Sequence, residues 1–357
     1  MGVTQLRTPL QLAHGPAWPN RLSLAPMTNK QSNPDGTLSD DEVTWLVARA
    51  EGGFGMTRTA AAYVDGAGKA WEGQLGVDDD AQLPGLARMA DGIRAAGSVS
   101  SVQIHHGGAV ADPVASGRPL VSAVDIPEQG VRGLTTDEVK RVVEAFADGA
   151  ARVERAGFDG VELHGAHGYL LTQFLALTND RSDGYGGDAE GRARIVLEIL
   201  DAVRSRTSSQ FQVGVRLSAE RFNLSTPEMV ALAGRLLTDD RVDYLDMSLW
   251  DVRKHREDAP GQELLATFAS LPRGRTRLGV TGKLGSSAEL SAALADGADF
   301  AVVGRPAIAD AQFAAKAVAD PGYAGPEFPV TKDHLRAQCV GEAFVEYFAT
   351  GWPHLVA

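Results

Sequence analysis

Residues 158–170 read FDGVELHGAHGYL, an alternating strand pattern that runs into a glycine-rich turn. Alternation along a strand places Val161 and Leu163 on one face and Glu162 and His164 on the other. Because the apolar face must be covered by other elements, we expect the polar face to look into a cavity.

The turn after this strand carries two more groups that form hydrogen bonds. Gly165 and Gly168 allow the backbone to turn tightly, which would fold His167 and Tyr169 back over the site that His164 enters. The pattern predicts three hydrogen-bonding side chains around one small volume. A histidine taken alone is more often structural, so the residues by themselves leave the role of this cluster open.

Strand and helix patterns alternate along the whole chain. The strand candidates are residues 22–25, 55–60, 99–104, 158–163, 213–217, 244–247, 278–280 and 300–303. The helix candidates are residues 40–51, 81–96, 136–156, 189–206, 226–237, 286–295 and 309–318, with a weaker one at 263–270. This alternation favours an α/β fold in one domain, a (β/α)8 TIM barrel, over an open doubly wound sheet. We place the barrel at about residues 20–318, with long loops after strands 3 and 4, and a C-terminal tail at 319–357.

Composition narrows the class of protein. The chain has 357 residues, a formal net charge of -12 and a single cysteine. The acidic balance argues against a nucleic-acid partner and a polybasic membrane surface, and a lone cysteine fits a reducing compartment. The first residues lack a signal-peptide pattern, and no run approaches the ~20 apolar residues of a membrane span. We expect a cytoplasmic protein that acts on a small molecule.

Polar side chains share one register on three consecutive strand candidates. Gln103, Glu162, His164 and Arg216 all face away from their apolar neighbours. In a barrel they would point into the interior near the carboxyl ends of the strands, where the active sites of this fold lie. A buried arginine and a buried glutamate are each costly alone, so we expect Arg216 to pair with Glu162 or with a charged ligand.

Two turns near the end of the barrel predict a phosphate site. Gly282 and Lys283 follow one strand candidate, and Gly304 and Arg305 follow the next. Glycine lets an anion approach backbone N–H groups closely, and barrels often bind phosphate in the loops after strands seven and eight. The sequence therefore predicts a phosphorylated ligand that reaches from the barrel centre to these loops.

Six motifs, taken in order, resemble the old yellow enzyme family of FMN-dependent ene-reductases. They are residues 25–28 (APMT), 102–108 (VQIHHGG), 164–169 (HGAHGY), 179–187 (NDRSDGYGG), 215–218 (VRLS) and 304–306 (GRP). The resemblance implies FMN bound without a covalent link over the barrel mouth, with NADPH or NADH as the electron donor. The flavin contacts that it implies are Ala25, Pro26, Met27 and Thr28 along the ring, Gln103 and Arg216 at the pyrimidine edge, and Gly282, Lys283, Gly304 and Arg305 at the phosphate.

The resemblance also implies the chemistry. His164 and His167 would hold the carbonyl oxygen of an α,β-unsaturated substrate, hydride would pass from the flavin to the β-carbon, and Tyr169 would protonate the α-carbon. Lys30 would lie in the substrate pocket, where some relatives have a tyrosine. No metal is expected.

The chain departs from the family pattern at several positions. Lys283 replaces the second glycine of a usual pair, and we expect its backbone N–H to contribute only if its φ is negative. Ala109 and Gly191 are further departures. The tail that contains Trp352 follows no recognisable pattern; in some relatives such a tail reaches a neighbouring subunit, and a homodimer or higher homo-oligomer is compatible with the resemblance.

Other interpretations stay open at this point. Flavin chemistry runs in both directions, so the same scaffold is compatible with oxidative desaturation or aromatisation of a metabolite. An FMN-binding protein without turnover is a remoter alternative. A metal-dependent hydrolase with His164 and His167 as ligands is also remote, because no matching cluster of acidic ligands accompanies the two histidines.

Overall fold

The computed structural model describes residues 5–357, and its centre is a closed ring of eight parallel strands. In the order of the ring the strands are β1 (Leu22–Leu24), β2 (Met56–Arg58), β4 (Val99–His105), β7 (Gly160–Gly165), β8 (Gln212–Ser218), β9 (Tyr244–Ser248), β10 (Arg277–Thr281) and β11 (Phe300–Val303). Pairing of β1 with β11 and of β2 with β4 closes the ring. The expected (β/α)8 TIM barrel is confirmed.

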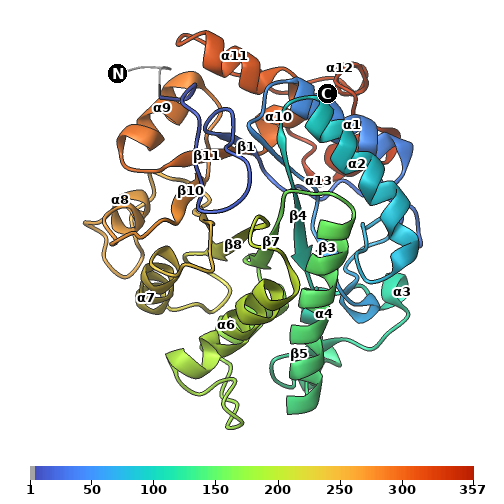
Figure 1. Ribbon diagram of the computed structural model, residues 1–357, viewed down its shortest axis with the longest axis vertical. Coiled ribbons are helices and arrows are strands. Elements are labelled where there is room, and N and C mark those ends of the chain that lie inside the picture. The colour runs from blue at the N-terminus through green and yellow to red at the C-terminus, as the bar shows by residue number, and fades with distance from the viewer. Residues whose placement is uncertain (1–4) are drawn as a thin grey trace.

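Helices form a ring outside the strands (Figure 1). The main ones are α1 (Asp40–Glu51), α2 (Leu83–Ala95), α4 (Thr136–Arg155), α6 (Ala189–Arg206), α7 (Thr226–Leu237), α8 (Leu264–Ala269), α9 (Ser287–Ala295), α10 (Arg305–Ala309) and α11 (Phe313–Ala319). Short elements occupy the loops: β3 (Ala62–Tyr63), α3 (Pro113–Ser116), β5 (Val121–Ser122), β6 (Arg132–Gly133) and α5 (Leu170–Leu175). No helix in the described part of the chain is long and apolar enough to cross a membrane.

One predicted helix, residues 309–318, is wrong in its bounds, because the segment forms α10 and α11 instead. Helix α10 starts earlier, with Pro306 in its first turn, where the ring presets the helical φ. It ends where Asp310 turns extended, at φ -141° and ψ 105°. The Asp310 carboxylate accepts hydrogen bonds from Lys316 Nζ at 2.7 Å and Tyr323 Oη at 2.5 Å, and this holds the break in place.

Aromatic side chains fill the amino end of the barrel. The Trp18 ring, from a segment before β1, packs edge-on against Phe300 and Tyr244 with ring centroids 4.8 and 5.5 Å apart. Gly214 and Gly279 make room for these rings, because a Cβ on either glycine would collide with Tyr244 or Phe300. The barrel is thus packed at this end, and its polar layer lies toward the carboxyl ends of the strands.

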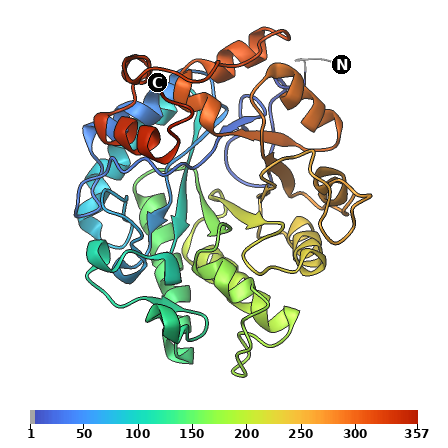
Figure 2. The ribbon, with the colours of Figure 1, turned by 180° about the vertical axis from the view of Figure 1, so that it is seen from behind.

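The C-terminal tail folds back over the same chain. It forms α12 (Lys332–Ala337) and α13 (Glu342–Gly351), drawn in red beside the blue α1 in Figure 2. Phe344 packs edge-on against Trp45 of α1, with centroids 5.0 Å apart. The buried Arg49 donates to Ala307 O at 3.0 Å and to Gln338 O at 2.5 Å, so one guanidinium ties α1 to α10 and to the tail. Burial lowers the pKa of Arg49 to about 9.

A carboxyl group is buried beneath the loop that follows β1. Glu42 of α1 is 1% exposed and accepts hydrogen bonds from Asn29 Nδ2, at 3.0 Å, and from Ser32 Oγ. Burial raises the pKa of Glu42, against the lowering effect of these two bonds. Folding therefore favours the protonated form of this group.

Replacing Glu42 by glutamine should change how stability depends on pH. Since the folded-state pKa of Glu42 is raised, its favourable contribution is present at low pH and is lost as the pH rises through that pKa. Glu42→Gln is neutral at every pH, so the variant should gain stability relative to the wild type as the pH rises from about 5 to 8. Urea unfolding of the two holoproteins across this range measures the difference, and parallel curves would contradict the prediction.

Candidate active site

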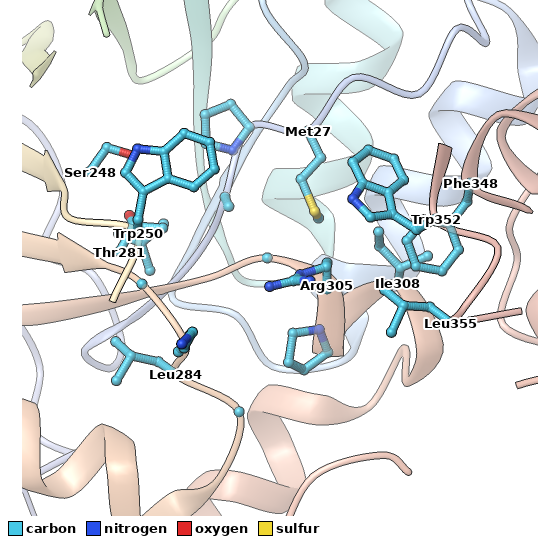
Figure 3. A pocket seen from close by; sticks show the side chains of 18 of the residues that line it. Met27, Ser248, Trp250, Thr281, Leu284, Arg305, Ile308, Phe348, Trp352 and Leu355 are labelled. Carbon is cyan, nitrogen blue, oxygen red and sulfur yellow. The ribbon is translucent and has the colours of Figure 1, made fainter. Parts of the chain in front are cut away.

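A cavity of about 880 Å³ opens at the carboxyl ends of the strands. Figure 3 shows that Ser248, Trp250 and Thr281 line one side, Met27 and Arg305 the middle, and Phe348 and Trp352 the other side. The predicted site residues among its lining are Ala25, Pro26, Met27, Thr28, His167, Arg216, Gly282, Lys283, Gly304 and Arg305. Gln103, His164, Tyr169 and Lys30 are not part of this lining, although the His164 ring contacts both His167 and Tyr169.

Four buried charged side chains fill the barrel just below the cavity. Arg58 of β2 pairs with Glu162 of β7 and lies 3.1 Å from Asp246 Oδ2 of β9. Arg216 Nε of β8 lies 3.4 Å from the same oxygen. Gln103 Nε2 donates to Glu162 Oε1 at 2.8 Å. Two cations and two anions from four different strands thus balance one another, as buried charges must.

Of the two partners predicted for Arg216, Glu162 is wrong, and a charged ligand stays a prediction. Glu162 is held by Arg58 and Gln103, whereas Arg216 faces Asp246, its direct neighbour in the β8–β9 pairing. Sequence reasoning missed both Arg58 and Asp246. Asp246 did carry a signal, because it alternates with the buried Leu245 and Met247 in the strand. Arg58 lies at the end of a strand of three residues, too short to show a period.

Two histidines and a tyrosine converge above this charged layer, as the sequence predicted. The rings of His164 and His167 have centroids 5.2 Å apart, and Tyr169 lies 5.1 Å from His164. His167 Nε2 lies 2.8 Å from Ser248 Oγ, and His167 N donates to Ser218 Oγ at 3.0 Å. His164 Nδ1 is buried and has no hydrogen-bond partner in the described part of the chain. This orphaned polar atom indicates a place for a ligand.

The turn that forms this cluster differs in detail from the expectation. Gly168 has a positive φ of 82°, but the residue before it, His167, is also left-handed at φ 64°. Gly165 is needed for packing instead, since a Cβ there would lie 2.9 Å from Leu217 Cδ2 and 3.0 Å from Arg216 O. The left-handed backbone conformation costs a non-glycine residue about 1–3 kcal/mol of free energy, and residues in this conformation cluster at functional sites.

Both histidines are neutral and the tyrosine is protonated. Burial first, and then the nearby Arg216, lower the pKa of His167 to about 3. The pKa of His164 is also well below the usual value, again through burial first, then through His167, His105 and the two arginines. Burial raises the pKa of Tyr169 to about 12. The cluster therefore offers neutral hydrogen-bonding groups and one weak acid.

The two predicted phosphate turns lie on one side of the cavity. A Cβ on Gly282 would lie 2.7 Å from Asp251 N, so only glycine fits this turn. The condition set for Lys283 is not met, because its φ is +50°, and its Nζ lies 2.9 Å from Asp251 Oδ2. Arg305 is exposed at the start of α10, and its side chain forms no ion pair or hydrogen bond with residues 5–357.

The wall opposite Trp250 comes from the tail, which sequence reasoning could not place. Phe344, Tyr347, Phe348, Trp352 and Leu355 all line the cavity of their own chain. Lys30 lies next to this wall, with its Nζ 5.2 Å from the centroid of the Tyr347 ring. In the sequence of helix α13, apolar residues lie three and four positions apart. This pattern could have predicted that one face of the helix is buried.

Comparison with known proteins identifies a family. Residues 5–320 match the family described as NADH:flavin oxidoreductase / NADH oxidase. The chain is 36% identical over 311 residues to the probable NADH-dependent flavin oxidoreductase YqiG of Bacillus subtilis, covering 83% of each chain. It is 33% identical over 239 residues to NADPH dehydrogenase of Clostridium acetobutylicum, covering 64% of this chain and 69% of the relative.

Solved structures agree with the sequence matches. Morphinone reductase in complex with tetrahydroNAD superimposes with a TM-score of 0.78 and 27% identity over 96% of both chains. Some further relatives are much longer proteins, of which this chain spans about a third.

The buried ion pairs provide a direct test of the site's architecture. Arg58→Met removes one cation and leaves Glu162 and Asp246 short of a partner, so it should lower the free energy of unfolding by about 3–5 kcal/mol. The control Arg235→Met breaks an exposed pair with Glu190 and should cost about 1 kcal/mol or less. Urea unfolding measures the free energy of unfolding of the two variants. Equal decreases would show that the buried ion pairs stabilise the fold no more than the exposed pair does.

Proposed function

Since this chain belongs to the NADH:flavin oxidoreductase / NADH oxidase family, that of the old yellow enzymes, and therefore uses FMN with NADH or NADPH as donor, we propose that it is an ene-reductase. Its substrates would be α,β-unsaturated carbonyl compounds or similarly activated alkenes. The observation that carries this proposal is the neutral, buried pair His164 and His167 beside Tyr169, with His164 Nδ1 unpartnered among residues 5–357.

The cavity suits FMN in size and in chemistry. Its volume of about 880 Å³ lies in the range of sites for ligands of this size. Arg305, whose side chain has no partner among residues 5–357, and the turns at Gly282 and Gly304 would receive the phosphate, whereas the positive φ of Lys283 argues against a contribution from its backbone N–H. Ala25, Pro26, Met27 and Thr28 would line the ring, with Gln103 and Arg216 at its pyrimidine edge. When bound, FMN supplies the hydride that reduces the alkene.

The two histidines would act by holding the substrate oxygen. Because both are neutral, an N–H of each can donate to a carbonyl oxygen without a charge to be desolvated. Hydrogen bonds to this oxygen draw electron density from the alkene and stabilise the negative charge that grows on the oxygen during hydride addition. Burial keeps both histidines neutral, Arg216 adds to this effect at both by raising the cost of a further positive charge, and Arg58 does so at His164.

Tyr169 would complete the reaction as an acid. Hydride adds to the β-carbon, and the Tyr169 hydroxyl gives its proton to the α-carbon, so one hydride and one proton saturate the double bond. The ring packs edge-on against His105 with centroids 4.7 Å apart, and this contact fixes its position. Lys30 and Tyr347 would form the outer part of the substrate pocket, where their contact closes one side.

Single variants separate the roles of these residues. Tyr169→Phe should slow alkene reduction by about 10²- to 10⁴-fold, because it removes the proton donor, while reduction of the flavin by NAD(P)H stays near the wild-type rate. His164→Ala should raise KM for an enone by about 3- to 10-fold through the loss of one neutral hydrogen bond. Stopped-flow measurement of each half-reaction tests both. Equal loss of the two half-reactions in Tyr169→Phe would count against the proton-donor role.

The protonation states predict an unusual pH profile. Because the pKa of His167 is about 3 and that of Tyr169 about 12, neither group changes charge in the working range. Single-turnover alkene reduction by the reduced enzyme should therefore show no inflection near pH 6.5, from about pH 6 to 9. A loss of rate with an apparent pKa near 6.5 would mean that a histidine titrates there and is not held neutral.

A further inference from the structure

Two loops on the rim of the cavity hold an unusual run of backbone conformations. After β8, three consecutive residues, Arg221, Phe222 and Asn223, have φ values of 67°, 51° and 59°. After β9, Trp250 has a φ of 62°. The left-handed region costs a non-glycine residue roughly 1–2 kcal/mol, and such conformations persist only where the surroundings enforce them.

The surroundings do enforce them. The buried Glu220 accepts hydrogen bonds from Lys254 Nζ at 2.6 Å and from Glu257 N at 2.9 Å, which ties the two loops together. Asn223 O accepts from Leu177 N at 2.8 Å on the other side. Phe222 covers Gly168, where a Cβ would lie 2.9 Å from Phe222 Cδ1. The rim is therefore fastened to the turn that carries His167 and Tyr169.

The strained rim presents one cation on one aromatic ring. The guanidinium of Arg221 lies 4.3 Å from the ring centroid of Trp250. Trp250 is 49% exposed, lines the cavity and meets His167 edge-on at 6.2 Å. Arg221 makes no ion pair within residues 5–357, whereas the carboxylates of its own loops, Glu220 and Glu257, both pair with Lys254. A stacked guanidinium keeps its N–H edge free for a planar or bidentate acceptor.

The reaction brings an anion to this place. The nicotinamide of NADH or NADPH would have to enter the cavity that His167 and Trp250 line, and the pyrophosphate attached to it would then lie toward the cavity mouth. A chain with a formal charge of -12 repels such an anion unless a local cation receives it. We propose that Arg221, held over the Trp250 ring, binds the pyrophosphate of the nicotinamide dinucleotide.

This proposal concerns the donor and not the alkene. It rests on the use of a nicotinamide donor, which follows from membership of the family. It does not depend on the ene-reductase proposal. Normal flavin reduction with no alkene turnover would reject the ene-reductase proposal alone.

Anaerobic reduction of the FMN-loaded enzyme, followed at the flavin absorption band, tests it. Arg221→Met should raise the Kd for NADH about tenfold, the loss expected for a charge-assisted hydrogen bond, with the limiting rate kept. The Kd for 1-benzyl-1,4-dihydronicotinamide, which has no phosphate, should stay unchanged. The control Arg235→Met removes an exposed arginine of α7, and the same charge, and should leave both Kd values as in the wild type.

Two further measurements sharpen the outcome. Higher ionic strength should weaken NADH binding to the wild type more than to Arg221→Met. Trp250→Leu should also raise the Kd for NADH, because it removes the ring that orients the guanidinium. An unchanged Kd for NADH in Arg221→Met, an equal rise for the benzyl analogue, or loss of FMN from the variant would overturn the proposal.

Discussion

The pairing of Arg58, Glu162, Asp246 and Arg216 inside the barrel is the constraint on which the rest of the site depends. These side chains come from β2, β7, β9 and β8, so a site with this charge balance exists only when the barrel is closed. The burial of these four charged side chains is tolerated because each one lies beside an opposite charge or forms a hydrogen bond. The network therefore links global closure of the fold to the local electrostatics of the cavity.

The charged layer also adds to the effect of burial on the pKa of the two histidines above it. Arg216 lies beside His167, and together with Arg58 it lowers the pKa of His164. The same arginine faces the cavity, where an anionic ligand would meet it. One side chain thus acts in two directions: it keeps a histidine neutral and it offers positive charge to whatever occupies the cavity. Arg216 is free for this second role because it is paired only loosely, with its Nε 3.4 Å from Asp246 Oδ2.

Much of this arrangement could be predicted from sequence, and the failures have physical causes. Strand alternation placed Glu162, His164 and Arg216 on the inner face correctly, because period and burial follow from local pattern. Alternation does not give the register between strands, and register decides that Gln103 stands opposite Glu162 and Arg216 opposite Asp246. Arg58 reaches Glu162 across the interior from a strand that is not its neighbour. The position of the tail could not be predicted because its aromatic residues pack against side chains that are distant in the sequence, such as Trp45.

The cavity is formed by two separate parts of the chain, the barrel and the tail. The barrel contributes the charged floor and the histidine turn, while α13 and the residues after it contribute an aromatic wall, and Arg49 joins the two parts. A wall made from a segment outside the barrel strands can change in sequence without altering any of those strands. Divergence among such proteins can therefore remodel ligand preference through substitutions in α13 and the residues after it, leaving the fold of the barrel intact.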